Sequence, residues 1–524
     1  MARALAFLTR IGDFVRGLTG WQRFVLALAM GAISALAYAP FGIFPALLLC
    51  FAGLVLLIDG TQTRPRPIWN AAFVGWTFAF GQFLLGFYWV GYAFMVDAAD
   101  HAWQIPIIEF CLPGGMALYI AAACALAARF WRPDASRVFA LAICYALGEW
   151  VRGHALTGFP WNLPAYGWGA SLGVMQSVAL FGSYGLTLLT VLFGASLALL
   201  FTRAGDWRVP AGMSALFVVL WIGGDVRLAL HPTVPIENIH LRLVQPNVPQ
   251  TEKYVPRYRE RNWRRLIDLS LAKNGPTPTH IVWPEAAPPF LLTRAPEALD
   301  DIALMTSDKV LLTGAVRIEA SSATDYRLFN SLYIFAHGGQ LLATYDKFHL
   351  VPFGEYLPLK SLFNAIGIAK LVNSPGDFRA GRGPMTFDIP GAPPVTPLIC
   401  YEILFPDEIA AARRPGWYVN VTDDSWFGPP SSTGPYQHLL TARFRAIEQG
   451  LPIARDANTG ISAVIDPVGR ITVSLAAGQM GAIDAMLPAA LPRTPYSRFG
   501  EWLFVVLLVL CAAAGWIVRR EIRA

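Results

Sequence analysis

Charged residues are scarce in this chain of 524 residues: they make up 15% of it, whereas 55% is hydrophobic. A wholly soluble protein of this length carries more charge, so that class is excluded and a membrane protein is expected. The formal net charge is +6. The arginines gather at the ends of apolar segments, which favours a role in membrane orientation over nucleic-acid binding. We therefore expect no nucleic-acid partner.

Cysteine is rare outside the apolar segments. Only Cys400 of the six cysteines lies in polar sequence. The others fall in or beside long apolar stretches: Cys50, Cys111, Cys124, Cys144 and Cys511. The chain has no Cys-x-x-Cys pair and no cluster of cysteine and histidine, so it predicts neither a disulfide framework of the secreted type nor a metal site. We expect no cofactor either.

Long apolar stretches fill the N-terminal part of the chain and recur near its end. Most of them reach the roughly 20 residues that cross a bilayer. They lie at about 22–39, 41–59, 70–95, 104–128, 138–153, 168–202, 210–230 and 501–518. The fifth is short and the sixth long, so the boundaries of these two are the least defined. Because the apolar series continues past Ala35-Leu36-Ala37, no cleaved signal is predicted.

Basic residues in the short loops predict the orientation of these spans. Loops rich in lysine or arginine stay in the cytoplasm, and here the N-terminus, alternate loops and the C-terminal tail are basic. Seven crossings then carry the chain outside and the eighth returns it. We expect a membrane domain at 1–230, an extracytoplasmic catalytic domain at 231–495, and a last transmembrane helix with a cytoplasmic tail at 496–524. In a bacterium this means the inner membrane, with the catalytic domain in the periplasm.

The polar domain alternates strand and helix patterns, which predicts an α/β layered fold. Strands are expected at 239–244, 280–283, 310–316, 331–335, 395–400 and 417–421, with a hairpin of 461–465 and 471–475. Helices are expected near 256–273, 404–413 and 436–449.

Reactive side chains stand at three predicted strand ends of this domain. Glu285 closes Val-Trp-Pro-Glu, Lys347 lies in Tyr-Asp-Lys-Phe-His, and Cys400 follows Pro-Leu-Ile. Cys400 is expected at a strand-to-helix turn, where a helix N-terminus lowers the pKa of a thiol and backbone N–H groups can receive an oxyanion. Taken singly, each residue also has a structural interpretation: a carboxylate at a helix end, a surface lysine paired with Asp346, and a buried thiol.

Taken together and in this order, the three segments resemble the Glu-Lys-Cys triad of the nitrilase (carbon–nitrogen hydrolase) superfamily. Trp-Pro-Glu, Asp-Lys-x-x-Leu-Val-Pro-Phe-Gly-Glu and Ile-Cys-Tyr-Glu, with Trp-Phe-Gly at 426–428 and Gln-His at 437–438, are similar to motifs of the apolipoprotein N-acyltransferase family. Residues 148–153 and 157–161 of the membrane region also resemble that family. The resemblance implies about eight transmembrane helices and a nitrilase-like domain, an α-β-β-α sandwich.

The resemblance also implies an activity. The expected enzyme moves a fatty acyl chain from a membrane phospholipid, typically phosphatidylethanolamine, to the α-amine of the N-terminal S-diacylglyceryl-cysteine of apolipoproteins, the last step of lipoprotein maturation. Cys400 would carry the chain as a thioester, Glu285 would be the general base, and Lys347 would stabilise the oxyanion. Such an enzyme follows ping-pong kinetics, and we expect it to act as a monomer.

Further residues are expected to support the triad by the same resemblance: Glu355, Tyr401, Glu402, Asn330 and Trp426. A surface carboxylate for Glu355 and a turn-forming role for Asn330 remain open. The chain departs from the family at one point: where the family usually has Asn-Asp before Trp-Phe-Gly, this chain has Asp423-Asp424-Ser425. Any role of that asparagine amide is therefore in doubt.

Several alternatives stay open. Residues 357–372 are apolar with lysines near both ends, which fits either a lid on the bilayer or a helix packed on the domain core. A membrane-anchored nitrilase-type amidase or hydrolase would share the triad and pass the acyl group to water. A transporter or scaffold would carry ionisable residues inside its spans. Seven preceding spans exceed what a tether needs, and the intact triad motifs disfavour an inert domain.

Overall fold

The computed structural model describes residues 2–202, 207–273, 275–320, 326–365, 371, 376–411 and 413–521. The chain divides into two compact units. The first combines Met1–Gly91, Gln104–His231 and Thr494–Ala524, and the second combines Tyr92–Trp103 and Pro232–Arg493.

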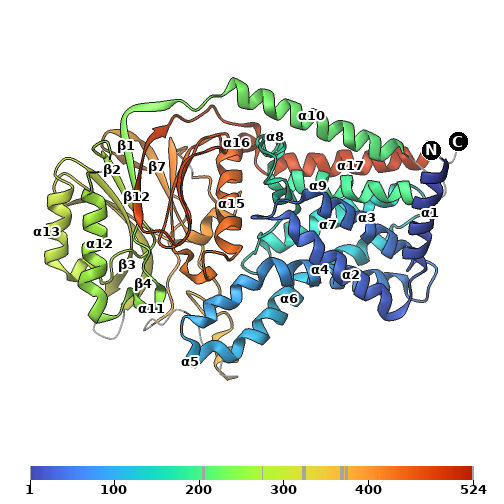
Figure 1. Ribbon diagram of the computed structural model, residues 1–524, viewed down its shortest axis with the longest axis horizontal. Coiled ribbons are helices and arrows are strands. Elements are labelled where there is room, and N and C mark those ends of the chain that lie inside the picture. The colour runs from blue at the N-terminus through green and yellow to red at the C-terminus, as the bar shows by residue number, and fades with distance from the viewer. Residues whose placement is uncertain are drawn as a thin grey trace. The chain divides into compact units, whose positions relative to one another are not determined.

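The first unit is helical (Figure 1). Its α-helices are α1 (Ala2–Gly17), α2 (Gly20–Ser34), α3 (Phe44–Asp59), α4 (Pro67–Phe87), α6 (Ile105–Arg129), α7 (Ser136–His154), α8 (Leu172–Met175), α9 (Val178–Leu197), α10 (Arg208–Leu230), α16 (Pro495–Phe499) and α17 (Trp502–Glu521). Its 3₁₀ helices are η1 (Ala35–Ala37), η4 (Pro164–Trp168) and η5 (Ala198–Phe201). Between α4 and α6 the chain forms η2 (Tyr88–Met95), α5 (Ala98–His101) and η3 (Ala102–Gln104).

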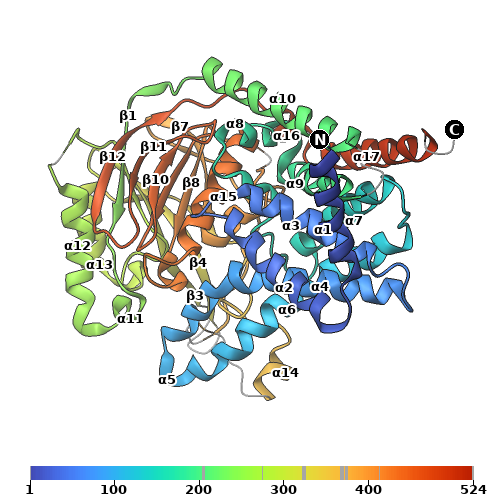
Figure 2. The same cartoon turned by 45° about the vertical axis from the view of Figure 1, so that its right-hand side comes forward.

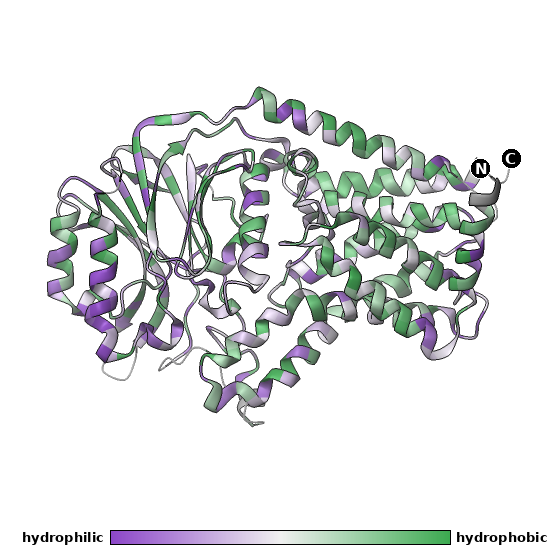
Figure 3. Ribbon diagram, viewed as in Figure 1, coloured by the Kyte–Doolittle hydropathy of each residue, from purple (hydrophilic) through white to green (hydrophobic). Residues whose placement is uncertain are grey.

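Six helical segments of the described chain are long and apolar enough to cross a membrane. They are Gly20–Ala37, Pro67–Met95, Ala98–Arg129, Val178–Phe201, Arg208–Leu230 and Trp502–Arg519, and Figure 3 shows the hydrophobic residues along them. The membrane region is thus as predicted, but six segments meet this standard where eight spans were expected. Of the other two stretches, α3 has 16 residues, and α7 contains the buried charges of Glu149 and Arg152.

Buried polar contacts and small residues hold the first unit together. Arg152 bonds the Glu149 carboxylate and the carbonyl oxygens of Phe159 and Trp161, the last at 3.0 Å. This ties the two segments that resembled the family, 148–153 and 157–161, to each other. Close helix packing relies on glycine: a Cβ at Gly31 would lie 1.8 Å from the carbonyl oxygen of Phe78 on α4.

The second unit contains two six-stranded sheets. The first has the order β12-β1-β2-β3-β4-β5 and the second the order β11-β10-β9-β8-β7-β6. The strands are β1 (Pro235–Gln245), β2 (His280–Trp283), β3 (Val310–Ala320), β4 (Tyr326–Ala336), β5 (Gln340–Asp346), β6 (Phe387–Ile389), β7 (Ala392–Ile399), β8 (Trp417–Thr422), β9 (Ile453–Ala457), β10 (Ser462–Ile465), β11 (Ile471–Leu475) and β12 (Gly481–Pro488). In each sheet, three neighbouring strands run parallel: β1, β2 and β3 in the first, and β7, β8 and β9 in the second.

Helices cover the outer face of each sheet, which gives the predicted α-β-β-α order. Figures 1 and 2 show α12 (Arg259–Leu271) and α13 (Pro296–Met305) along the first sheet and α15 (Gly434–Gln449) along the second. One apolar core joins the inner faces of the two sheets and another joins the first sheet to α12 and α13. The short elements are α11 (Gln250–Lys253), η6 (Pro256–Tyr258), η7 (Leu292–Arg294), α14 (Lys360–Ala365), η8 (Cys400–Leu404) and η9 (Asp424–Phe427).

All the strands predicted from the sequence are present, and the hairpin of β10 and β11 is confirmed. The helix predicted at 404–413 is wrong: the described residues of this segment form the end of η8 and then turns. Phe405 adopts an extended backbone, as expected for a residue that precedes proline. Within the predicted lid at 357–372, α14 is described, whereas residues 366–370 and 372 lie outside the described residues.

Candidate active site

The carboxyl ends of three strands carry the predicted triad. β2 ends two residues before Glu285, β5 ends one residue before Lys347, and β7 ends one residue before Cys400. Strands β2 and β5 belong to the first sheet and β7 to the second. The three side chains therefore meet at one end of the sandwich, where both sheets contribute.

Lys347 lies between two carboxylates. Its Nζ is 2.9 Å from Oε2 of Glu355 and 3.7 Å from Oε1 of Glu285. The Asn330 side-chain amide donates to both carboxylates, at 2.7 Å to Glu285 and 2.9 Å to Glu355. All four side chains are buried. Asn330 lies within β4 and Glu355 is 6% exposed, so the alternatives of a turn asparagine and a surface carboxylate are wrong.

The pKa values of these side chains depend on their burial and on the charges of their neighbours. Burial raises the pKa of Glu285, an effect that Lys347 opposes and that Glu355 and Asp423 reinforce. Burial by itself would lower the pKa of Lys347, but Glu355 and Glu285 outweigh it and raise that pKa. Lys347 is therefore a permanent cation, and Glu285 has the increased proton affinity that suits a general base.

Cys400 occupies an unusual backbone conformation at the start of η8. Its φ is 50°, in the left-handed region that residues with a Cβ seldom adopt, and its side chain is half-buried. Burial, then Glu285, raise the pKa of the thiol well above its ordinary value, while Lys347 and the Thr422 hydroxyl oppose this. The predicted lowering by a helix N-terminus is wrong, because a five-residue 3₁₀ turn stands where an α-helix was expected. The resting thiol is protonated and needs a base.

Glu402 connects the cysteine turn to the lysine strand. Its carboxylate accepts hydrogen bonds from the backbone N–H of Ile399 at 2.6 Å and of Phe348 at 2.7 Å, and from the Tyr345 hydroxyl at 2.9 Å. Because Ile399 precedes Cys400 and Phe348 follows Lys347, one buried carboxylate fixes both backbones. Glu402 therefore positions both backbones, while its supporting role in catalysis stays a prediction.

Glu402 should make stability depend on pH. Burial raises its pKa from 4.5 to about 7, although these hydrogen bonds oppose the change. Because this pKa is higher in the folded protein than in the unfolded chain, the protonated carboxyl group stabilises the fold at pH values below about 4.5. This contribution to the free energy of unfolding, up to about 3 kcal/mol, is lost as the pH rises through about 7. We expect the apparent thermal midpoint in detergent to fall between about pH 5 and pH 8, and to fall less in Glu402→Gln. Equal slopes in the two proteins would contradict this.

A polar network behind Cys400 was not recognised in the sequence. The Nε2 of His438 is 3.2 Å from the Cys400 carbonyl oxygen, and its Nδ1 lies 3.1 Å from both Arg455 and Asp424. Arg455 Nη2 in turn donates to Asp424 at 2.9 Å. Burial and Arg455 lower the pKa of His438, so the neutral ring donates its N–H from Nε2 to the Cys400 carbonyl. The motif Gln-His at 437–438 was the available signal.

A glycine on β3 allows the Glu285 loop to approach the sheet. A Cβ at Gly314 would lie 2.6 Å from Cα of Glu285 and 2.6 Å from the Pro284 carbonyl oxygen. Gly314→Ala is expected to displace Glu285 and reduce kcat by about 10²-fold, the cost of misplacing a catalytic group by about 1 Å. Gly376→Ala is the control, because its Cβ would meet ordinary contacts at 3.8 Å. Equal rates of the two variants would contradict the expectation.

Tyr401 and Trp426 were also predicted to belong to the site. Tyr401 directly follows the cysteine, is 7% exposed, and packs its ring against His349 and Phe405. Trp426 lies half-buried on η9. A substrate-binding or supporting role for either residue stays a prediction.

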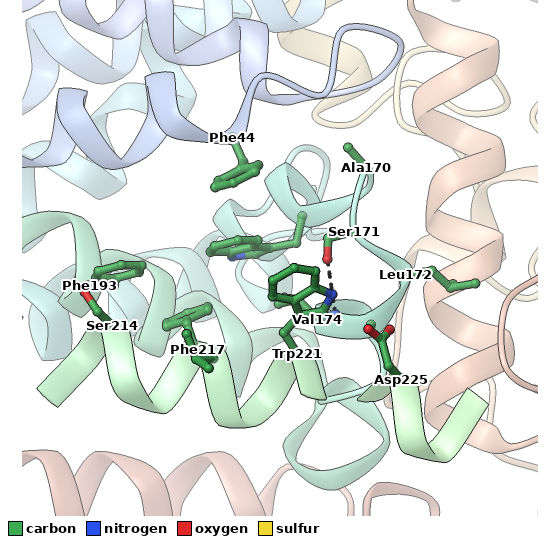
Figure 4. Close-up of a pocket in the computed structure, with 13 residues that line it drawn as sticks. Phe44, Ala170, Ser171, Leu172, Val174, Phe193, Ser214, Phe217, Trp221 and Asp225 are labelled. Carbon is green, nitrogen blue, oxygen red and sulfur yellow. Dashed lines mark hydrogen bonds between the residues drawn. The ribbon is translucent and has the colours of Figure 1, made fainter. Parts of the chain in front are cut away.

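A groove in the first unit is a separate candidate (Figure 4). It has a volume of about 580 Å³ and is lined by stacked aromatic rings, among them Phe44, Trp168 and Phe217. Its serines, Ser171 and Ser214, bond the backbone of their own helices. No cysteine or lysine is among the described residues that line this groove, whereas Cys400 interacts electrostatically with Glu285 and Lys347.

Comparison with known proteins places both units. Residues 242–494 match the carbon-nitrogen hydrolase family, the class that the two-sheet fold and its site define. An amidase from Nesterenkonia sp. is a similar solved structure, with 16% identity, coverage of 53% of this chain and 98% of the amidase, and a TM-score of 0.35.

The full-length relatives are more specific. Residues 30–197 match the apolipoprotein N-acyltransferase N-terminal domain. Proteins named apolipoprotein N-acyltransferase from Rhodopseudomonas palustris and Bradyrhizobium diazoefficiens are 45% and 46% identical over 518 residues, 96% of each chain. One from Brucella suis is 39% identical over 523 residues, 97% of each chain. This chain belongs to the apolipoprotein N-acyltransferase family, which confirms the resemblance seen in the sequence.

Proposed function

We propose that this enzyme transfers a fatty acyl chain from a membrane phospholipid to the α-amine of the N-terminal S-diacylglyceryl-cysteine of apolipoproteins. The observation that carries the proposal is a half-buried Cys400 beside a buried Glu285–Lys347–Glu355 cluster, in a chain that aligns over 96% of its length with enzymes of that name. Phosphatidylethanolamine is the proposed donor, and the monomer is the proposed active form.

The first half-reaction loads the enzyme. Glu285 takes the proton from the Cys400 thiol, and the thiolate attacks the ester carbonyl of the phospholipid. Lys347 and a backbone N–H at the cysteine turn stabilise the oxyanion. Glu285 then gives its proton to the departing glyceryl oxygen, which leaves a thioester on Cys400 and a released lysophospholipid. The raised pKa of Cys400 means that the thiol needs a base, and the raised pKa of Glu285 makes its carboxylate a stronger one.

The second half-reaction transfers the acyl chain from Cys400 to the acceptor amine. The α-amine of the lipid-bearing cysteine attacks the thioester carbonyl and Glu285 accepts the amine proton. The C–S bond then breaks as the amide forms, and Glu285 passes that proton to the departing sulfur, which restores the Cys400 thiol and the Glu285 carboxylate. Splitting the transfer means that the two lipid substrates never need to occupy the site together. Ping-pong kinetics follow from this order.

The membrane arrangement is part of the proposal. The helices α3 and α7 would complete eight spans with the six candidate segments, and the three predicted domains keep the boundaries 1–230, 231–495 and 496–524. The basic loops support a catalytic domain on the periplasmic side of the bacterial inner membrane. A site tethered there meets lipid substrates that cannot leave the bilayer.

One measurement separates this function from that of a membrane-anchored amidase or hydrolase. The detergent-purified enzyme is incubated with phosphatidylethanolamine and weighed as the intact protein, before and after addition of a diacylglyceryl-cysteine peptide. We expect a hydroxylamine-labile acyl mass that the peptide discharges with formation of an N-acyl peptide. Release of free fatty acid, with no transfer to the peptide, would assign the hydrolase function instead.

A further inference from the structure

A buried lysine and a buried aspartate hold Glu285 from two directions. Lys253, at the end of α11, is 3% exposed, and Asp423, in the residue after β8, is also 3% exposed. Their side chains form an ion pair. Lys253 Nζ also donates to the backbone oxygen of Glu285 at 3.0 Å, and the backbone N–H of Asp423 donates to Oε2 of the Glu285 side chain at 2.9 Å.

Asp423 is itself locked in place. Its Oδ1 accepts hydrogen bonds from the Ser425 hydroxyl at 2.6 Å, from the Ser425 N–H at 3.2 Å and from the Asn458 side-chain amide at 3.0 Å, while Oδ2 faces Lys253. Both carboxylate oxygens are therefore occupied. The N–H that points at Glu285 belongs to a residue with little freedom to move.

The charges of the pair matter as much as its geometry. Asp423 is one of the groups, after burial and Glu355, that raise the pKa of Glu285. Burial by itself would lower the pKa of Lys253, but Asp423, with Tyr254 and Glu285, outweighs burial and raises it, so Lys253 stays a cation. An unpaired Asp423 would add a third buried negative charge to those of Glu285 and Glu355. An unpaired Lys253 would add a cation in contact with the base.

We propose that Lys253 and Asp423 form a neutral buried pair that positions Glu285 and keeps its carboxylate available to accept the proton of Cys400. Lys253 and Asp423 are positioning residues, because they act through Glu285. In this chain the carboxylate of Asp423, at the position where the family usually has asparagine, pairs with the buried Lys253. The inference rests on the proposed role of Glu285 as base.

The test uses alkylation of Cys400 by iodoacetamide, which requires neither phospholipid nor acceptor. The full chain in detergent is alkylated over a pH series, and the Cys400 peptide is quantified by mass spectrometry. In Lys253→Gln the unpaired aspartate should slow alkylation near neutral pH by about tenfold and move the profile to higher pH. Asp423→Asn should move it to lower pH, and the double variant should return to within about twofold of the wild type.

Lys309→Gln removes the same charge from the pair with Asp308, whose side chain is 67% exposed, and should leave the profile unchanged. An unchanged profile in Lys253→Gln, or a double variant no faster than Lys253→Gln, would overturn the proposal. If Lys253→Gln does not fold, Asp423→Asn tests the proposal by itself. An alkylation profile of Asp423→Asn that does not move to lower pH would also overturn the proposal. Since alkylation involves no acyl transfer, a failed acyltransferase assay would leave this result intact.

Discussion

Replacing Cys400 by alanine is expected to abolish acyl transfer and leave the fold intact. Removing the nucleophile of an enzyme with a covalent intermediate typically costs on the order of 10⁶-fold in rate. Alanine keeps a Cβ, so the strain of the backbone at φ 50° is unchanged. The thiol is half-buried, so its loss opens little cavity. The N-acyl peptide should fall to background while the apparent thermal midpoint stays near that of the wild type.

The serine variant refines this prediction. Cys400→Ser keeps a hydroxyl near Glu285, but an alcohol is a far poorer nucleophile than a thiolate, so we expect no acyl mass on this variant either. Cys111→Ala is the matched control, because Cys111 is an exposed free cysteine of the first unit, and it should retain full activity. An acyl mass on Cys400→Ala would show that another residue carries the chain.

Replacing Lys347 by methionine has the second largest expected effect, because it damages both rate and stability. Loss of an oxyanion-stabilising group costs about 10²–10³-fold in kcat. The substitution also leaves Glu285 and Glu355 buried without the cation that lies 3.7 Å and 2.9 Å from them. Removing one partner of a buried ion pair typically destabilises by about 3–5 kcal/mol. Both losses should appear, in acyl-enzyme formation and in the thermal midpoint.

A second substitution separates the two effects. In Lys347→Met combined with Glu355→Gln, one of the two buried negative charges is removed, so stability should largely return while the rate stays low. Lys309→Met, at a surface pair, controls for the loss of a lysine. If the double variant also regained its rate, Lys347 would serve the fold and not the reaction.

Glu285 and Cys400 were readable from the sequence because each follows an apolar strand. His280–Trp283 is buried throughout and the last five residues of Ala392–Ile399 are buried, and such runs stand out without knowledge of their neighbours. Lys347 was readable only by its motif, because it follows β5, which is exposed or half-buried for most of its length. Strands β5, β6, β9 and β12 were missed. β12 is half-buried for most of its length and β9 includes Arg455 and Asp456, so neither has a clear apolar pattern. Their place is decided by pairing with β1 and β8.

The membrane character and the two-part organisation could be predicted from the sequence, because hydropathy is a local property of the chain, and the motifs predicted the candidate triad by their resemblance to a family. The tertiary structure decided what surrounds the triad. Lys253 and Asp423 are 170 residues apart in the chain, so their ion pair has no local signal. The protonation of the Cys400 thiol also depends on burial and on Glu285, which raise its pKa. The helix dipole that the local sequence had predicted is absent, because a five-residue 3₁₀ turn stands in place of the α-helix.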